Sequence, residues 1–448
     1  MTWVGGSRAT RPRPRERPRA PRRLLRRAPK PRADRSSAVS SSSRSVVVQK
    51  YGGSSVATTH KLKQVAQLVA AKRRAGHDVV VVVSAMGDAT DELLARAKAI
   101  SKEPDRRELD MLLSVGERIS MSLLAMAIRE EGLEAVSLTG SQSGILTSDS
   151  HANARIIEVR PFRVEDELDR GRIVIVAGYQ GVSYKKEITT LGRGGSDTTA
   201  VALAAALNAE SCEIYSDVDG VYTTDPRISE GAKKIPSLGY AEMQEMAEAG
   251  AKVLNAQAVE FAKEKGIAIY AKKTGSSDPG TIIRVNAPAP ASGVRGVAFE
   301  RELSVIAGSA ELQAIRALLL RLTELEVHPR QLQLAQLSDR MAFSAVVPLE
   351  NVHNDTQVAA AVTKTFGPGS YRVDRGAVSL IGEGITKSST LLERALAILE
   401  ADGVEVHGMT TSSFRITFLL DRTRTQAAAA SLHQGLKVAA GIEASPDA

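Results

Sequence analysis

Buried strands and helices alternate along the first two thirds of the chain. The run SVVVQK ends at Lys50 and DVVVVVSAMG occupies 78–87, and both are the continuous β-branched kind found in parallel sheets that are covered on two faces. Between them, apolar residues from Leu62 to Val69 recur at helical spacing. Because this alternation continues to about residue 285, it predicts an α/β layered domain over 46–285.

The pattern changes at the Pro-, Ala- and Gly-rich stretch NAPAPASG, which opens a predicted linker over 286–296. Two shorter units follow, each reading as a strand, a helix and two further strands. We expect them to be small α+β modules of the ferredoxin-like kind, over 297–373 and 374–440. Modules of this kind more often bind ligands or pair with one another than catalyse.

The net charge of +8 is concentrated at the start of the chain. Residues 1–45 carry 14 Lys and Arg against Glu16 and Asp34, a net of +12, and subtracting this from +8 leaves −4 for the rest. The prolines and the lack of apolar periodicity predict a disordered extension. An extension from an upstream start site, a solvated tail and a nucleic-acid-binding arm are alternatives, and nucleic acid is the least favoured. The only apolar pair, Leu24 and Leu25, is too short for a signal peptide.

Composition also limits the kinds of site that the chain can build. Cys212 is the only cysteine, which excludes disulfides within the chain and cysteine-based zinc sites and predicts a reducing, cytoplasmic setting. The seven histidines lack metal-ligand spacing, so we expect no protein-built metal site. No apolar run approaches the roughly 20 residues of a transmembrane helix, so we expect no membrane span.

A lysine and paired glycines follow the first predicted strand. After Lys50 come Gly52, Gly53 and Ser54. Such glycines let backbone N–H groups turn toward an anion, and a lysine adds a mobile positive charge for a transferring phosphoryl group. The spacing differs from that of a Walker A loop, and the same short motif also occurs in ordinary turns.

A second group of polar residues, in TTLGRGGSDTTA, lies at the start of a predicted helix. Ser196 or Asp197 can cap this helix, which is the simpler interpretation. Arg193 offers a planar fork for a substrate carboxylate, and Asp197 could hold the lysine or a bound ammonium. Capping alone would not need the arginine.

A third group lies in IYSDVDGVYTTDPR, where Ser216, Asp217, Tyr222 and Arg227 follow a buried strand. Carboxylates in turns usually cap the backbone, but they can also contact a ribose or an Mg²⁺ that is held mainly by phosphates. Glu117, in SVGERIS, is either a surface residue or a carboxylate that faces a substrate amine.

These runs, together with SAMGDATDELL, LTGSQSGILT, HANARI and GAKVLN, resemble the aspartate kinases of the monofunctional actinobacterial type. The match runs through 46–285 in unbroken order. The resemblance implies an amino acid kinase fold, an αβα sandwich, followed by two ACT modules. It also implies that the chain phosphorylates the side chain of aspartate to 4-phosphoaspartate with ATP and Mg²⁺, the metal being bound mainly through the nucleotide phosphates.

The resemblance also implies a role for each matching residue. Lys50 would stabilise the transferring phosphoryl group and Asp197 would orient Lys50. The aspartate side would comprise Ser84, Thr90, Glu117, Arg193 and Ser196, and the nucleotide side Lys50, Gly52, Gly53, Ser54, Ser216, Asp217, Tyr222, Arg227 and Lys252. A carboxylate acceptor is already ionised at neutral pH, so positioning and charge neutralisation would supply most of the rate.

The resemblance weakens after residue 285. The stretches VIAGSAELQAIRALL and GEGITKSSTLLERAL lack the Pro-Gly turn that opens the module helix in the family, where lysine or threonine binds as a feedback inhibitor. We therefore expect insensitivity to lysine and threonine, and a role in a dedicated pathway for a specialised metabolite. Two alternatives are that the modules bind an amino acid through other residues and that they serve only as a dimer interface. We also expect a homo-oligomer built through these modules.

Two other functions compete with this interpretation. Another amino acid kinase, acting on a glutamate derivative, carbamate or a nucleotide, would not be expected to carry SAMGDAT, GERIS and SDVDGVYTTDPR together. A catalytically silent regulatory paralogue would be expected to lack Lys50, Glu117, Arg193 or Asp197, and all four are present.

Overall fold

The computed structural model describes residues 45–192, 194–251, 253–288, 293–325, 327–337, 339–349, 352, 355–387 and 389–438. The predicted N-terminal extension, apart from Ser45, and the site residues Arg193 and Lys252 lie outside these ranges.

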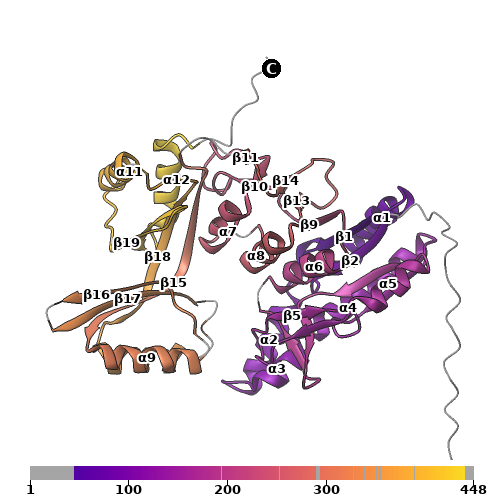
Figure 1. Ribbon diagram of the computed structural model, residues 1–448, viewed down its shortest axis with the longest axis horizontal. Helices are drawn as coiled ribbons and strands as arrows, with labels where there is room; N and C mark the ends of the chain where they lie inside the picture. Colours follow the sequence, from indigo (N-terminus) through magenta and orange to yellow (C-terminus); the bar gives the residue numbers. More distant parts are fainter. Residues whose placement is uncertain are drawn as a thin grey trace, which may run out of the picture. The chain divides into compact units, whose positions relative to one another are not determined.

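An eight-stranded sheet forms the centre of the first part of the chain, which is predicted above to be catalytic (Figure 1). Its strand order is β12-β14-β13-β9-β1-β2-β6-β3. Neighbouring strands from β13 to β3 are parallel, whereas β14 runs antiparallel to β13. The strands are β1 (Val46–Tyr51), β2 (Asp78–Val83), β3 (Ala135–Leu138), β6 (Ile173–Ala177), β9 (Ser211–Ser216), β12 (Ser237–Leu238), β13 (Ile269–Lys273) and β14 (Thr281–Ile283).

The continuous valine runs are explained by helices on both faces of this sheet. In β2, Val79 and Val81 pack with α1 (Thr59–Arg74) and α4 (Val115–Glu130), whereas Val80 and Val82 pack on the other side with α6 (Gly195–Ala206) and neighbouring helices. The latter include α5 (Phe162–Asp169), α7 (Tyr240–Glu248) and α8 (Ala256–Lys265). The predicted αβα sandwich is confirmed.

Short strands that periodicity does not reveal form two further sheets. One has the order β5-β4-β7-β8, from β4 (Ile145–Thr147), β5 (Ile156–Val159), β7 (Gln180–Ser183) and β8 (Ile188–Thr190), and α3 (Arg106–Leu113) contacts β8. The other pairs β10 (Val221–Tyr222) with β11 (Lys234–Ile235). The helix α2 (Ala89–Ile100) lies between β2 and α3 in the chain.

Among the described residues, one helical segment, Arg106–Glu130, is long and apolar enough to span a membrane by length and composition. Half of its apolar window is buried within the protein, and Ser114 divides it into α3 and α4. In α4, Leu124 and Ile128 are fully buried against the central sheet. These contacts are those of a core helix.

The regulatory part contains one six-stranded sheet, of order β16-β17-β15-β18-β20-β19. Its strands are β15 (Gly296–Ala310), β16 (Arg330–Leu337), β17 (Arg340–Pro348), β18 (Tyr371–Ile381), β19 (Gly408–Thr411) and β20 (Arg415–Asp421). Its helices are α9 (Leu312–Glu324), α10 (Asp355–Phe366), α11 (Ser389–Ala401) and α12 (Thr425–Gly435).

The two modules of this sheet have separate cores but share long strands. In β15, Val297 packs with α11 and α12, whereas Ile306 packs with α9 and α10. Correspondingly, residues 296–300 pair with the second half of β18 and residues 303–310 with β17. The first strand therefore contributes to both modules, and the expected boundary at 373–374 falls within β18. The module limits given above stay predictions.

Candidate active site

Four predicted or neighbouring site residues lie at one edge of the central sheet. Lys50 is near the carboxyl end of β1, Ser84 and Gly178 directly follow β2 and β6, and Ser216 ends β9. Because these strands are adjacent and parallel, their carboxyl ends meet at the same edge. This is the edge at which open α/β sheets bind ligands.

Lys50 and Asp197 form a close ion pair at this edge. Nζ of Lys50 lies 2.7 Å from Oδ1 of Asp197, and the side chains are 12% and 9% exposed. Asp197 is presented by the first turn of α6, which begins after Gly194 in the left-handed region at φ 73°. A Cβ on Gly194 would lie 2.4 Å from Nδ2 of Asn255, so only glycine fits there.

The paired glycines bring the backbone close to this lysine. Gly52 donates its N–H to the carbonyl of Tyr215 at 3.1 Å, and a Cβ on Gly52 would lie 3.5 Å from Nζ of Lys50. A Cβ on Gly53 would lie only 2.9 Å from the carbonyl oxygen of Ala85. The segments after β1 and β2 approach so closely that a side chain at position 53 would clash, which explains why this residue is glycine. The next residue is exposed Ser54.

Glu117 lies at the start of α4 with one unpartnered oxygen. Glu117 is 3% exposed, and its Oε1 accepts a hydrogen bond from the N–H of Ala85 at 3.2 Å. Its Oε2 is buried and has no hydrogen-bond partner among the described residues. Burial raises the pKa of the Glu117 carboxyl to about 7. A buried carboxylate oxygen of this kind needs a cationic or donor partner.

The other predicted aspartate-side residues that the structure describes follow β2 or lie in the first turn of a helix. The carbonyl of Ser84 accepts a hydrogen bond from Oγ of Ser120 at 2.7 Å. Thr90 lies half-buried in the first turn of α2. Ser196 is 6% exposed, and a Cβ on Gly178 would lie 2.6 Å from its Oγ. Because Ala85 lies beside both Gly53 and Glu117, the Glu117 carboxyl is next to the segment with the paired glycines.

The predicted nucleotide-side residues are more exposed. Asp217 lies exposed in the turn after β9, and the hydroxyl of Tyr222 donates to Oδ1 of Asp219 at 2.8 Å. Arg227 is 86% exposed and pairs with Asp225 at 2.6 Å. They form an open rim beyond the end of β9, in contrast to the buried Lys50 and Glu117.

Comparisons with known proteins identify the family. The model of the amino acid kinase family matches residues 45–272. The aspartokinase of Mycolicibacterium smegmatis is 41% identical over 411 residues, covering 89% of this chain and 98% of that protein. The chain belongs to the aspartokinase family. The aspartokinase of Corynebacterium glutamicum is likewise 41% identical over 412 residues, with the same coverage of 89% and 98%.

A solved member of the aspartokinase family has the same fold. The crystal structure of Escherichia coli aspartokinase III in complex with aspartate and ADP superposes with a TM-score of 0.75 at 24% identity, covering 88% of this chain and 100% of that one. The likeness covers the catalytic sandwich and the regulatory sheet, and the expected fold class is confirmed.

Thr274 is a residue of this aspartokinase-family site that sequence reasoning missed. Its Oγ1 lies 2.7 Å from Oγ of Ser55 in the glycine turn and donates to the carbonyl of Ser216 at 3.2 Å. It therefore connects the phosphate end of the site with the nucleotide rim. No local motif marks it, because Ser55 is 219 positions away in the chain.

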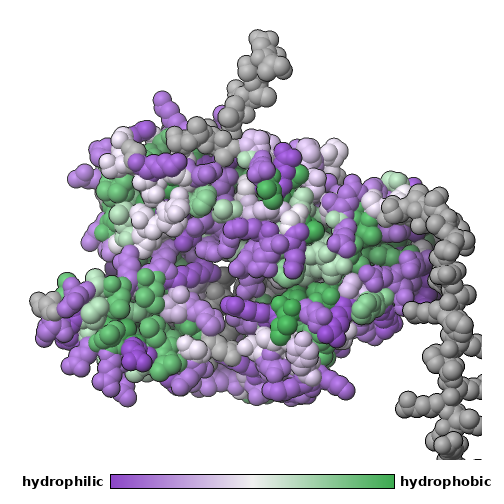
Figure 2. Space-filling view, in the orientation of Figure 1, coloured by the Kyte–Doolittle hydropathy of each residue, from purple (hydrophilic) through white to green (hydrophobic). Residues whose placement is uncertain are grey.

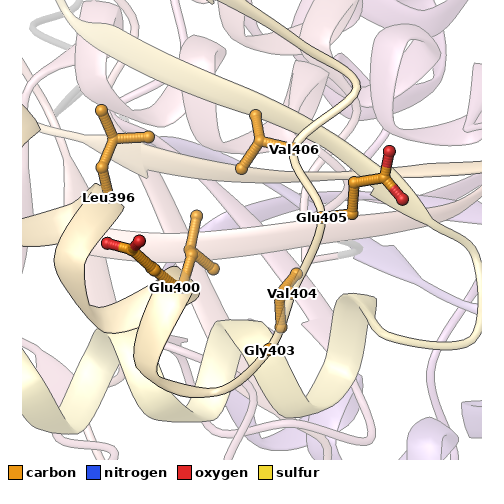
Figure 3. A pocket seen from close by; sticks show the side chains of 7 residues that line it. Leu396, Glu400, Gly403, Val404, Glu405 and Val406 are labelled. Carbon is orange, nitrogen blue, oxygen red and sulfur yellow. The ribbon is translucent and has the colours of Figure 1, made fainter.

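A groove in the regulatory part lies away from these residues. It has a volume of about 500 Å³ and lies between the end of α11 and the segment that leads to β19 (Figure 3). Its lining consists of Leu396, Leu399, Glu400, Gly403, Val404, Glu405 and Val406. None of these is a predicted catalytic residue. The catalytic site is therefore assigned from the geometry of its residues and not from the size of a cavity.

Proposed function

We propose that this chain transfers the γ-phosphoryl group of ATP to the side-chain carboxylate of aspartate, forming 4-phosphoaspartate and ADP. The observation that carries the proposal is the combination of the Lys50–Asp197 pair with the buried, unpartnered Oε2 of Glu117. A site that bound only phosphate would need the positive charge of Lys50 but no buried carboxylate. An anionic group that lacks a partner beside it suits the ammonium of an amino acid.

The chemistry follows from these charges. A carboxylate oxygen of aspartate attacks the γ-phosphorus, the bond from this phosphorus to the leaving oxygen of ADP breaks, and no general base is needed because the acceptor is ionised. Lys50 neutralises charge on the transferring group, and Asp197 keeps Nζ of Lys50 in place. Glu117 binds the ammonium, while Ser84, Thr90, Arg193 and Ser196 bind the remainder of aspartate.

On the nucleotide side, backbone groups of Gly52, Gly53 and Ser54 lie along the phosphates, and the nucleotide contacts come from Ser216, Asp217, Tyr222, Arg227 and Lys252. Mg²⁺, bound mainly through the phosphates, supplies further charge neutralisation. The described residues contain no group of three or more metal-ligating side chains. This composition suits a cation that the nucleotide brings with it.

An ATP-coupled hydroxamate assay across aspartate, glutamate and N-acetylglutamate tests the activity. We expect turnover with aspartate alone and its loss in Lys50→Ala. Lys185→Ala is the matched control because it removes a Lys–Asp pair, to Asp149 at 3.0 Å, whose lysine is 75% exposed. Equal turnover of glutamate would indicate another amino acid kinase, and absence of turnover with every acceptor would indicate a silent paralogue.

We also propose that lysine and threonine do not inhibit the enzyme and that it serves a dedicated pathway. The helix α9 starts after Glu311 in place of a Pro-Gly turn, with no side-chain cap. The groove in Figure 3 presents the carboxylates of Glu400 and Glu405 and no basic side chain in its lining, which disfavours the carboxylate of an amino acid. Assays with lysine, threonine and both together check this: strong concerted inhibition contradicts it.

A homo-oligomer built through the regulatory sheet completes the proposal. Figure 2 shows apolar surface where Figure 1 places α9, β16 and β17. The exposed residues there include Leu320 at 66%, Leu332 at 47%, Leu334 at 43% and Leu337 at 57%. Exposed apolar area of this kind marks protein interfaces. Light scattering of the wild type and of Leu334→Lys should show a larger species that the substitution dissociates, and a monomeric wild type would contradict it.

The setting that we propose is the reducing cytoplasm. Cys212, the only cysteine, is fully buried and free, and burial is the main reason why its thiol pKa is raised. Because the protonated thiol is the unreactive form, Cys212 is a poor target for oxidation, which suits this setting.

A further inference from the structure

A buried carboxylate outside the proposed machinery joins three separate segments. Asp110, on α3, is fully buried. Its Oδ2 accepts a hydrogen bond from Nδ1 of His151 at 2.7 Å, and its Oδ1 accepts one from the hydroxyl of Thr190 at 2.5 Å. The N–H of Ala152 contacts both oxygens, at 3.0 and 3.2 Å. Burial raises the pKa of Asp110, and the hydrogen bonds from Thr190 and His151 act in the opposite direction.

One of these contacts holds the backbone in an unusual conformation. Ala152 has a φ of 66°, in the left-handed region that costs a residue with a Cβ free energy. The carboxylate of Asp110 accepts the N–H of this residue. Strained backbone of this kind persists when its surroundings fix it, and it often lies beside functional groups.

Thr190 connects this cluster to the substrate side of the site. Its carbonyl accepts the N–H of Ala154 at 2.9 Å, and the next residue, Leu191, donates to the carbonyl of Tyr179 at 2.9 Å. A Cβ on Gly195 would lie 2.6 Å from Cβ of Leu191, so the first turn of α6 packs directly on this segment. A shift of Thr190 would therefore move the turn that carries Ser196 and Asp197.

We propose that Asp110, with His151 and Thr190, positions the start of α6 for aspartate binding and phosphoryl transfer. This inference rests on the proposed function, since it assigns the cluster to the aspartate side of the same site. None of the three residues touches the reacting groups. They act through the packing of Leu191 against Gly195 at the start of α6, so they are positioning residues.

The position of the cluster in the chain supports this role. A buried carboxylate is costly to desolvate, and replacement of a whole buried polar cluster by apolar residues of similar volume is often neutral or stabilising. Here the carboxylate fastens α3 to two loops that meet beside the glycine-rich start of α6, as shown by the contact of a Cβ on Gly192 with Oδ1 of Asn153 at 3.1 Å. If the cluster positions the start of α6, its substitution should change the KM for aspartate more than the KM for ATP. A purely structural role predicts no such difference.

Thr190→Val tests the inference because it keeps the side-chain shape and removes only the hydroxyl. We expect the KM for aspartate to rise about five- to twentyfold and kcat to fall, with the KM for ATP changed less than about twofold. Thr190→Ser restores the hydroxyl and should restore the KM for aspartate. His151→Ala removes one bond from a half-buried side chain, and it should act in the same direction with a smaller effect.

Thr189→Val is the matched control. It removes a buried hydroxyl from the same strand, but that hydroxyl pairs with Oγ1 of Thr147 at 2.5 Å and not with Asp110. It should lower the melting temperature as Thr190→Val does and leave both KM values unchanged. Unchanged kinetics in both Thr190→Val and His151→Ala, or an equal change in Thr189→Val, would overturn the inference. A wild type that fails to phosphorylate aspartate would instead refute the proposed function.

Discussion

Replacement of Glu117 by glutamine should separate the charge of this side chain from its shape. The isosteric amide can still accept the N–H of Ala85, which now lies 3.2 Å from Oε1. What it loses is the negative charge on Oε2, the buried oxygen that has no partner in the structure. A hydrogen bond to a charged group contributes about 1.5–3 kcal/mol, so the KM for aspartate should rise about 10- to 150-fold while the KM for ATP stays within about twofold.

The pH dependence of the wild type gives the sharper test. Burial raises the pKa of Glu117 to about 7 in the free protein, and only the ionised form can pair with an ammonium. With that pKa, about ten molecules in eleven are competent at about pH 8 but only about one in eleven at about pH 6. As the pH falls from about 8 to about 6, the KM for aspartate should therefore rise about tenfold in the wild type and stay constant in Glu117→Gln.

The raised pKa of Glu117 also makes the stability of the folded protein depend on pH. Because the folded pKa lies above 4.5, Glu117 favours the folded protein fully at low pH, and this contribution is lost as the pH rises through about 7. Ionising the buried carboxyl costs about 3 kcal/mol above that range. Without aspartate, Glu117→Gln should thus be more stable than the wild type near pH 8, and added aspartate should narrow the difference.

Steady-state kinetics at a series of pH values and thermal unfolding with and without aspartate measure these effects. Glu242→Gln is the control: Glu242 is 4% exposed, its pKa is raised by burial and its Oε1 lacks a hydrogen-bond partner, but it lies on α7. A flat KM for aspartate in the wild type, or the same pH profile in Glu117→Gln, would refute the assignment of Glu117 to the ammonium.

Two further substitutions probe other contacts of the site. Asp197→Asn should lower kcat about 10- to 100-fold, with less effect on either KM, because Lys50 loses its ion partner at 2.7 Å; full activity in a rapid-quench assay would contradict this role. His433→Ala removes the contacts of its ring nitrogens with Thr223 at 2.9 Å and Ser229 at 3.2 Å. Calorimetry should therefore show a melting temperature lower by about 2–4 °C, and steady-state kinetics a higher KM for ATP. An unchanged KM for ATP would limit His433 to a structural role.

The sequence predicts the central sheet well because its strands are local signals. In β2 the five consecutive valines are all fully buried, on alternate faces, which is the property that a continuous β-branched run predicts. The strands of the sheet order β5-β4-β7-β8 have only three or four residues, too few for a periodicity to show. The sharing of β15 by both modules was not predicted for a different reason: its pairing partners decide which half of the strand belongs to which core.

The site shows the same division between local and long-range information. Lys50 and the glycine turn are recognisable because strand, glycines and helix are consecutive. The partnership of Lys50 with Asp197 depends on residues 147 positions apart, and it follows only from the resemblance or from the fold. Asp110 and Thr274 carry no local signal, since a lone carboxylate in a helix and a lone threonine in a turn are most often unremarkable polar residues.

The contacts between the catalytic and regulatory parts argue that loss of feedback inhibition would not make the regulatory part dispensable. The described residues of both parts belong to one compact unit. Arg415 of β20 lies 3.0 Å from Oε2 of Glu245 on α7, and His433 of α12 reaches the turn after β10 that carries Arg227. The regulatory sheet thus contacts the segment that carries Arg227. Under the proposed function, these contacts would hold Arg227 near ATP, which gives a physical reason for keeping the modules even without feedback inhibition.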